Sequence, residues 1–189
     1  MAKGRRVTDG GTPETFFSGL RAPVLGYRRK RLAEWALSLT QTENRHHVLV
    51  AGCSGGSSIL TMLKACPKAK VAGVDPSKVA IEKAGRMLKE EVEEGRCELI
   101  CSELEELPLR SRAFELAVSP DNISSFPEGT LKEIYRVLKP GGILLVYAFE
   151  GERVEKSIVL QEVMKAGFSE IRDFSDASQG YIGIVACKR

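Results

Sequence analysis

The glycine-rich stretch at residues 47–57, His-Val-Leu-Val-Ala-Gly-Cys-Ser-Gly-Gly-Ser, has the residue types of a ligand-binding turn. Four apolar residues, 48–51, predict a buried strand, and apolar residues at helical spacing begin soon after Ser57. The glycines at 52, 55 and 56 permit positive φ angles and leave no Cβ between the backbone and a ligand. In open α/β sheets, such a turn at the carboxyl end of a parallel strand binds nucleotide-like ligands. The alternative is a plain connection between a strand and a helix.

A second candidate group is the carboxylate of Asp75, which follows the next apolar strand, residues 71–74. Asp75 lies 19 residues after Gly56, and a carboxylate about 20 residues beyond a glycine turn is placed to accept both hydroxyls of a ribose. A helix is expected to begin at Pro76 and Ser77, so capping of that helix is an alternative role for Asp75. The two roles are compatible.

The rest of the chain alternates strand and helix patterns, which is typical of a parallel sheet covered by helices. The expected strands are 99–101, 114–119 and 143–148, and the expected helices are about 28–40, 77–95, 131–138 and 156–166. Two extended segments, 169–174 and 181–187, close the chain without a helix between them and should pair antiparallel. In the helix after Asp75, the side chains expected to face inward are Ala80, Ala84, Met87, Leu88 and Val92.

The composition is that of a globular protein, with 189 residues, 43% of them hydrophobic and 28% charged. No apolar run approaches the roughly 20 residues that span a bilayer, and no signal-peptide core follows the N-terminus. We therefore expect a cytoplasmic protein without membrane insertion. The five cysteines, at 53, 66, 97, 101 and 187, include no Cys-x-x-Cys pair, so buried thiols are favoured over a disulfide framework or a metal site.

The net charge of +3 is unevenly distributed. Residues 1–31 carry eight Lys or Arg against two carboxylates, a net charge of +6, and the remainder carries −3. Such a basic segment can attract an anionic substrate or a nucleic acid. A solvated N-terminus is the commoner explanation of such a run, and it is the one we favour here.

Four segments, taken in order, resemble the class I S-adenosylmethionine-dependent methyltransferases, in particular the type 11 group that is similar to quinone-biosynthesis methyltransferases. They are Val-Leu-Val-Ala-Gly-Cys-Ser-Gly-Gly (48–56), Gly-Val-Asp-Pro-Ser (73–77), the stretch 102–119, and Leu-Lys-Glu-Ile-Tyr-Arg-Val-Leu-Lys-Pro-Gly-Gly (131–142). The resemblance implies a Rossmann-like three-layer α/β sandwich, with a mostly parallel seven-stranded sheet and a C-terminal antiparallel strand. It also divides the single globular domain into a flexible basic N-terminus with a covering helix, 1–45, and a methyltransferase part, 46–189.

The resemblance further implies how the cofactor, S-adenosyl-L-methionine, lies on the sheet. Its methionine end would follow the backbone from Ala51 to Gly56, Asp75 would accept from the ribose, and Ser119 would flank the sulfonium. Adenine would lie between Pro76 and the turn at Glu103 and Leu104, which offers an acceptor and an amide donor. The implied cofactor-binding set is Ala51, Gly52, Cys53, Ser54, Gly56, Asp75, Pro76, Glu103, Leu104 and Ser119.

Two positions depart from the family pattern. Val50 stands where the family usually has an acidic residue that helps to hold the methionine amino group, and Ser54 replaces a glycine of the tight turn. A neutral carbonyl is a weaker partner for an ammonium than a carboxylate is. These departures motivate an alternative function, a non-catalytic cofactor sensor or partner-binding subunit.

The leading hypothesis is methyl transfer to a small-molecule acceptor, with nucleic acid a less favoured partner. In-line transfer from an activated donor requires alignment of the acceptor more than a general base. His46 and His47 precede the first strand and so should lie at the wrong end of the sheet. Asp121 follows the fourth strand and lies on the correct side, but a loop role is favoured for it. A nicotinamide-dependent dehydrogenase is a third hypothesis, disfavoured by the lack of a Gly-x-Gly-x-x-Gly run.

Overall fold

The chain forms an α/β domain, described by a computed structural model for residues 18–40, 42, 45–120, 127–150 and 156–189, with side chains from residue 26 onward. The helices are α1 (Ser18–Ser38), α2 (Ser57–Ala65), α3 (Lys78–Met87), α4 (Lys89–Glu93), α5 (Thr130–Val137) and α6 (Lys156–Lys165). The strands are β1 (His47–Ala51), β2 (Lys70–Asp75), β3 (Cys97–Cys101), β4 (Phe114–Pro120), β5 (Leu138–Phe149), β6 (Ser169–Asp176) and β7 (Tyr181–Cys187). Each expected strand is present, although β5 begins at Leu138 and so starts earlier than the predicted 143–148.

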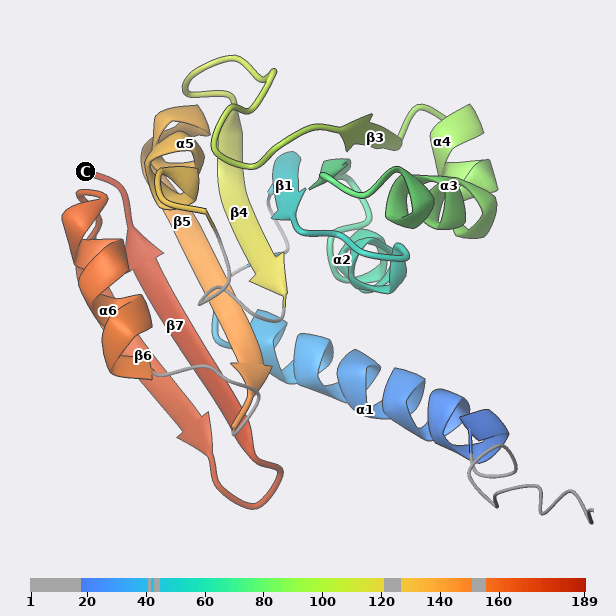
Figure 1. Cartoon of the computed structure of the whole chain (residues 1–189). Coiled ribbons are helices and arrows are strands. Elements are labelled where there is room, and N and C mark those ends of the chain that lie inside the picture. The colour runs from blue at the N-terminus through green and yellow to red at the C-terminus, as the bar shows by residue number, and fades with distance from the viewer. Residues whose placement is uncertain (1–17, 41, 43–44, 121–126, 151–155) are drawn as a thin grey trace, which may run out of the picture.

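The seven strands form one sheet in the order β3-β2-β1-β4-β5-β7-β6 (Figure 1). The five strands from β3 to β5 in that order run parallel, and β7 pairs antiparallel with both β5 and β6. The order reverses between β1 and β4, which is where open α/β sheets bind their ligands. The predicted fold class, including the antiparallel C-terminal strand, is confirmed.

Two apolar clusters, one on each face of the sheet, make the core. The first joins side chains of α1, α2 and α3 to alternate residues of the strands, for example Leu32, Met62 and Ala84 on the helices. The second joins α5 and α6 to the opposite face, for example through Ile134 and Val163. Because successive side chains of a strand point to opposite faces, Leu49 belongs to the second cluster and its neighbours to the first. The result is the expected three-layer sandwich.

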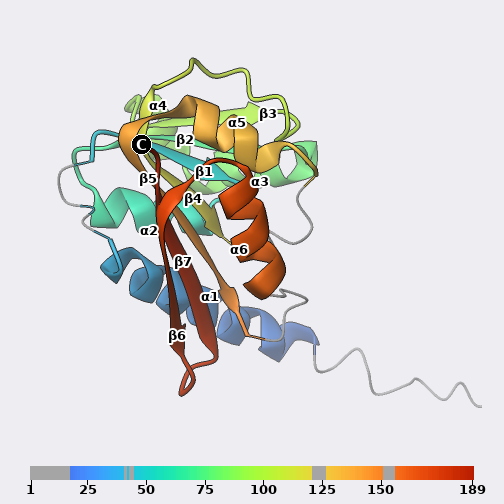
Figure 2. The ribbon, with the colours of Figure 1, turned by 90° about the vertical axis from the view of Figure 1, so that its left-hand side faces the viewer.

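Helix α1 lies across the carboxyl ends of β4 and β5, as the two views in Figures 1 and 2 show. Its residues Leu32 and Ala36 are fully buried, and Trp35 packs against Tyr181 of β7 with the ring centroids 5.5 Å apart. A Cβ atom added to Gly183 would come within 2.8 Å of the Leu39 side chain, so glycine at this position lets α1 approach the sheet closely. No helix of the described residues has the length and apolar character needed to cross a membrane.

Three local expectations differ from the structure. Helix α1 starts at Ser18, earlier than the predicted 28–40. The predicted helix 77–95 is broken into α3 and α4 at Leu88, and the predicted inward side chains Met87 and Val92 are exposed. The backbone leaves helical geometry at Leu88, with φ −110° and ψ 27°, and this separates α3 from α4. Cys101 is exposed rather than buried, because β3 is an edge strand.

Candidate functional site

The glycine-rich turn after β1 has a sharply folded backbone with positive φ angles at three positions. The φ angles are 76° at Gly52, 51° at Ser54 and 92° at Gly56. Ser54 therefore has a left-handed conformation, at a cost that glycine would not have. The N–H groups of Gly52 and Cys53 both donate to Val74 O, at 2.9 and 3.2 Å, which ties the start of the turn to β2.

Asp75 organises two backbone segments at the end of β2. Its Oδ2 accepts a hydrogen bond from the Ser54 N–H at 2.8 Å, and its Oδ1 accepts from the Ser77 N–H at 2.9 Å. The N-cap of α3 is Ser77, whose hydroxyl accepts from the Ala80 N–H. Ser77, and not Asp75, therefore caps this helix. A carboxylate offers about four lone-pair positions, so two protein bonds leave capacity for ribose hydroxyls. The same carboxylate supports the strained turn.

Ser119, near the end of β4, has a buried hydroxyl without a hydrogen-bond partner among the described residues. Its side chain has no exposed surface, and an unpaired buried hydroxyl is unfavourable unless a ligand or water completes its bonding. The structure thus shows, beside a cradle of positive-φ backbone, a polar atom that requires a partner. Both features fit a bound polar ligand such as S-adenosylmethionine.

A cavity of about 120 Å³ opens beside the turn. Three predicted residues line it, namely Gly52, Cys53 and Ser54. Residues that the sequence analysis did not assign complete it, from α1, from α2, and from the ends of β4 and β5: Arg29, Lys30, Ala33, Ser57, Ser58, Thr61, Pro120 and Tyr147. Four of these residues could have been suspected from the sequence. Ser57 and Ser58 directly follow the glycines of the turn, and Arg29 and Lys30 belong to the basic run near residue 30.

The predicted adenine side of the site lies outside this cavity. The ends of β2 and β3 lie together there, because the Ser102 N–H donates to Asp75 O at 3.3 Å and the Cys101 thiol donates to Pro76 O at 3.7 Å. This arrangement brings the turn at 103–104 toward Pro76. Glu103 is exposed, and the Leu104 side chain is buried in the core. Asp121, the candidate that follows β4, lies outside the described residues.

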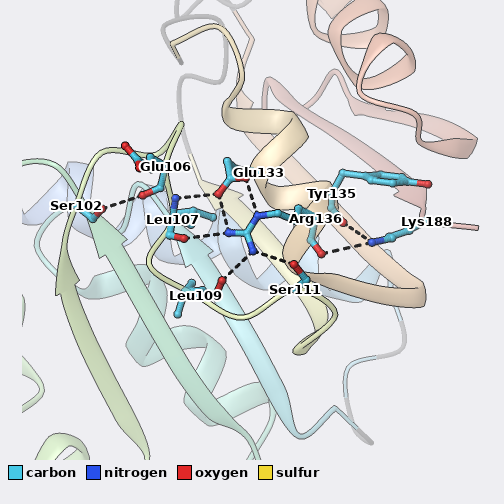
Figure 3. A network of polar contacts seen from close by, with 9 residues as sticks. All are labelled: Ser102, Glu106, Leu107, Leu109, Ser111, Glu133, Tyr135, Arg136 and Lys188. Carbon is cyan, nitrogen blue, oxygen red and sulfur yellow. Dashed lines mark hydrogen bonds and ion pairs between the residues drawn. The ribbon is translucent and has the colours of Figure 1, made fainter.

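The segment that leads from the adenine side into β4 is held against α5 by an ion pair (Figure 3). Arg136 forms a bidentate pair with Glu133, both bonds being 2.7 Å, and donates to Leu107 O and Leu109 O at 2.9 Å. Glu133 also accepts from the Leu107 N–H at 3.0 Å. Donation from Arg136 lowers the pKa of Glu133 despite its partial burial. We name Glu133, Arg136, Leu107 and Leu109 the α5 clamp.

The C-terminal end of α5 is closed by a lysine from the end of the chain. Lys188 is buried, and its ammonium donates to Tyr135 O at 2.6 Å and to Leu138 O at 2.8 Å (Figure 3). The ammonium also lies 4.5 Å from the centroid of the Tyr135 ring. Cations satisfy the free carbonyls of a helix C-terminus in this way. Burial lowers the pKa of Lys188.

The histidines lie where the sequence analysis predicted, at the amino end of the sheet. The backbone N–H groups of His46 and His47 both donate to Glu115 Oε2 at 2.8 Å. Glu115 lies at the start of β4. Burial opposes ionisation of Glu115, but the hydrogen bonds from Lys139 and from these N–H groups prevail and lower its pKa to about 2. The histidines are thus remote from the glycine-rich turn.

Cys53 lies in the cavity wall, but its chemistry is suppressed. The thiol is buried, and burial, followed by the nearby charge of Asp75, raises its pKa to about 12. A thiol with so high a pKa supplies little thiolate at neutral pH and is a poor nucleophile. Cys53 therefore acts as a small apolar side chain in this wall.

The fold and the turn define a Rossmann-like α/β domain of the class I methyltransferase type. A sequence profile of the type 11 methyltransferase domain family matches residues 49–146, more than half of the chain, and the chain belongs to this family. The resemblance inferred from the four motifs is confirmed. Membership of the family implies S-adenosylmethionine as the cofactor.

Individual relatives agree with this assignment. Malonyl-[acyl-carrier protein] O-methyltransferase of Priestia megaterium is 36% identical over 104 residues, which cover 54% of this chain and 36% of that protein. Carboxy-S-adenosyl-L-methionine synthase of Glaesserella parasuis is 24% identical over 87% of this chain and 73% of that protein. A SAM-dependent methyltransferase structure from Aquifex aeolicus has a TM-score of 0.71 at 19% identity, covering 93% of this chain and 98% of that one. The chain spans about a third of the length of the first relatives that it matches.

Proposed function

We propose that this protein transfers the methyl group of S-adenosylmethionine to a small-molecule acceptor. The observation that carries the proposal is the glycine-rich turn at the switch point of the sheet, joined to Asp75 by the Ser54 N–H, in a chain of the methyltransferase domain family. The cytoplasmic location expected from the sequence stays a prediction. The acceptors in the relatives' names are properties of those proteins, and we do not transfer them to this chain.

The residues of the chain would act mainly by binding and alignment. When bound, S-adenosylmethionine supplies a methyl group already activated on a sulfonium. The backbone of 51–56 would hold the methionine end, Asp75 the ribose, and Pro76 with the Glu103–Leu104 turn the adenine. The Ser119 hydroxyl would turn toward the ligand and gain the partner that it lacks. Helix α1, which crosses the carboxyl ends of β4 and β5, would exclude water from the transfer.

The methionine ammonium would have no charged partner on β1. Val50 is fully buried among apolar residues, so the acceptors that β1 and the turn after it offer to the ammonium are backbone carbonyls. A carboxylate introduced by Val50→Asp would be buried in the same cluster and would cost stability. That substitution therefore needs a measurement of unfolding beside any measurement of affinity.

Isothermal titration of the protein with S-adenosylmethionine tests the proposal most directly. We expect saturable binding with one site per chain, and no binding at millimolar ligand would refute the proposed function. NAD serves as the control ligand, because binding of NAD in preference to S-adenosylmethionine would support the dehydrogenase hypothesis instead.

Nothing in the comparisons favours the non-catalytic sensor or partner subunit. That hypothesis was suggested by the sequence departures at Val50 and Ser54, and Ser54 adopts a positive φ angle of 51° within the turn. Micromolar affinity for S-adenosylmethionine would remove the reason for that hypothesis. Transfer of a labelled methyl group to any acceptor would then establish the enzyme.

A further inference from the structure

The first turn of α5 has backbone donors that the protein leaves unused. The N-cap is Gly129, with a φ angle of 100°, and no side chain of the described residues caps the helix. The first backbone bond along the helix runs from the Glu133 N–H to Gly129 O. The N–H groups of Leu131 and Lys132 therefore have no acceptor in the part of the chain that the structure describes. They add to the partial positive charge at this helix end.

A buried hydroxyl group lies in the same turn. Thr130 is only 1% exposed, and its Oγ1 has no hydrogen-bond partner among the described residues. The Thr130 N–H donates to Pro127 O at 3.2 Å, so the backbone at this residue is fixed. A buried hydroxyl without a partner is unfavourable. It therefore gives a second and independent indication that a ligand completes the bonding of this turn.

A cavity of about 690 Å³ lies between the first turn of α5 and α6, and its volume is in the range of small-molecule sites. Residues 129–132, Thr130 among them, line one side. Ile158, Val159 and Ala166 of α6 give it an apolar side, and Ile158 is 45% exposed. Because α5 and α6 cover the face of the sheet opposite α2, this cavity is separate from the one beside the glycine-rich turn (Figure 2).

The charged side chains that line this cavity balance one another. They are Lys132 and Lys165, with Glu128 and Glu162 as the opposite charges. Lys165 pairs with Glu162 at 2.6 Å, and this bond, followed by the weaker effect of the Glu128 charge, raises the pKa of Lys165. The net side-chain charge therefore does not select the ligand. Selection rests instead on the donors of the first turn of α5 and on the apolar side.

We propose that this cavity binds a small aliphatic carboxylate, with its carboxylate group at the first turn of α5 and its aliphatic body against α6. The two carboxylate oxygens can accept from the Leu131 and Lys132 N–H groups and from the Thr130 hydroxyl. A helix N-terminus favours an anion over a neutral group of the same shape. The exposed Ile158 side chain would be covered by the aliphatic body. This site does not depend on the proposed methyl transfer.

NMR titration of the full-length, ¹⁵N-labelled protein with pentanoate at constant ionic strength tests the site. Pentanamide is the neutral control of similar shape, and acetate is the control without an aliphatic body. Thr130→Val removes the hydroxyl at nearly constant shape, and Thr130→Ser keeps it. Ile158→Gln removes part of the apolar side. Met164→Gln is its matched control, because Met164 is an exposed apolar residue of α6 that does not line the cavity.

The proposal expects pentanoate to shift the amide resonances of Leu131 and Lys132 in the wild type. Pentanamide and acetate should bind at least about tenfold more weakly. Thr130→Val and Ile158→Gln should each weaken pentanoate binding by at least about threefold, whereas Thr130→Ser and Met164→Gln should bind it as the wild type does. Without ligand, Thr130→Val should melt no lower than the wild type, because it loses no hydrogen bond.

Several results would overturn the site. Pentanamide binding as tightly as pentanoate would exclude a carboxylate ligand, and equal losses in Thr130→Ser and Thr130→Val would exclude the hydroxyl from recognition. A lower melting temperature of unliganded Thr130→Val would show that the hydroxyl already has a partner. Competition between pentanoate and S-adenosylhomocysteine would place pentanoate in the other cavity. None of the binding measurements on α5 requires S-adenosylmethionine, so failure of the proposed function is distinguishable from failure of this site.

Discussion

The polar groups at the two ends of the parallel strands differ in how many of them have hydrogen-bond partners within the protein. We call the end where these strands begin the amino edge of the sheet, and the end where they finish the carboxyl edge. At the amino edge, charged side chains bind several backbone groups each: Glu115 holds His46 and His47, the α5 clamp holds the segment 107–109, and Lys188 closes α5. At the carboxyl edge, the described residues include unpartnered buried hydroxyls at Ser119 and Thr130. The N-termini of α2 and α5 also lie there, each with a glycine N-cap and no side-chain cap.

This contrast separates the part of the molecule that stabilises the fold from the part that can bind a ligand. Paired groups contribute stability, whereas donors and acceptors left without protein partners are available to a substrate. Asp75 is the exception at the carboxyl edge, because it holds the turn and is also proposed to hold the ribose. If the contrast is right, substitutions at the two edges should affect different measurements.

The largest effect is expected from Asp75→Ala at the carboxyl edge. Loss of two charge-assisted bonds to the ribose should weaken binding of S-adenosylmethionine by roughly one to three orders of magnitude. The Ser54 and Ser77 N–H groups also lose their acceptor, so the melting temperature should fall as well. Calorimetric titration and thermal unfolding on the same protein measure the two effects.

Ser77→Ala is the matched control for this substitution. It removes the N-cap of α3, at a cost of about 1 kcal/mol in unfolding free energy, and leaves the Asp75 carboxylate in place. Its affinity for the cofactor should stay close to that of the wild type. A folded Asp75→Ala protein that binds as tightly as wild type would show that the ribose is held elsewhere.

The next effect is expected from Arg136→Gln at the amino edge. The substitution breaks the pair with Glu133 and removes the donor to Leu107 O and Leu109 O, so the unfolding free energy should fall by about 1 to 3 kcal/mol. Denaturant titration measures this loss. Lys165→Gln, which breaks an exposed pair with Glu162, is the control and should leave stability nearly unchanged.

The affinity of Arg136→Gln for the cofactor tests whether a substitution at the amino edge leaves ligand binding at the carboxyl edge unchanged. We expect it to change by less than about threefold, because the clamp binds the segment at its amino-edge end. A loss of tenfold or more would mean that the clamp also positions the adenine turn at 103–104, which lies upstream in the same segment.

A smaller effect concerns the pH dependence of stability. The pKa of Glu115 is about 2 in the folded protein against an ordinary value of 4.5, so the folded state favours the ionised carboxylate. The stability that Glu115 contributes is therefore complete above about pH 4.5 and is lost as the pH falls from there toward 2. Glu115→Gln should flatten this part of the curve of melting temperature against pH. Parallel curves for the two proteins would contradict the assignment.

The smallest effect is expected from Ser54→Gly, which relieves a φ angle of 51°. Relief of the left-handed conformation, offset by the greater entropy of the unfolded chain, should stabilise the protein by about 0.5 to 1 kcal/mol. Arg112→Gly is the control, because Arg112 has a φ angle of 55° at the start of β4, on the amino edge. Both substitutions should raise the melting temperature, and only Ser54→Gly should change cofactor affinity. Equal affinities in the two variants would show that the strain at Ser54 has no role in binding.

Sequence alone determined the features that depend on neighbouring residues. Apolar runs located the strands, and the glycines placed the turn after β1. The Lys-Pro-Gly-Gly run at 139–142 marked the end of α5, although the structure places both glycines inside β5, which begins at Leu138. A Cβ on Gly142 would come within 2.7 Å of Lys139 O. These features are local because backbone conformation and burial periodicity are set within a few residues.

Tertiary structure alone decided which distant groups meet. Arg136 reaches Leu107 O across 29 positions of the chain, and Lys188 reaches Tyr135 O across 53. The same is true of Arg29 and Lys30, which the sequence shows only as part of a basic run and which α1 carries to the glycine-rich turn. Helical periodicity predicts which face of α1 is apolar. It does not predict on which strands that face packs, because this depends on the order of the strands in the assembled sheet.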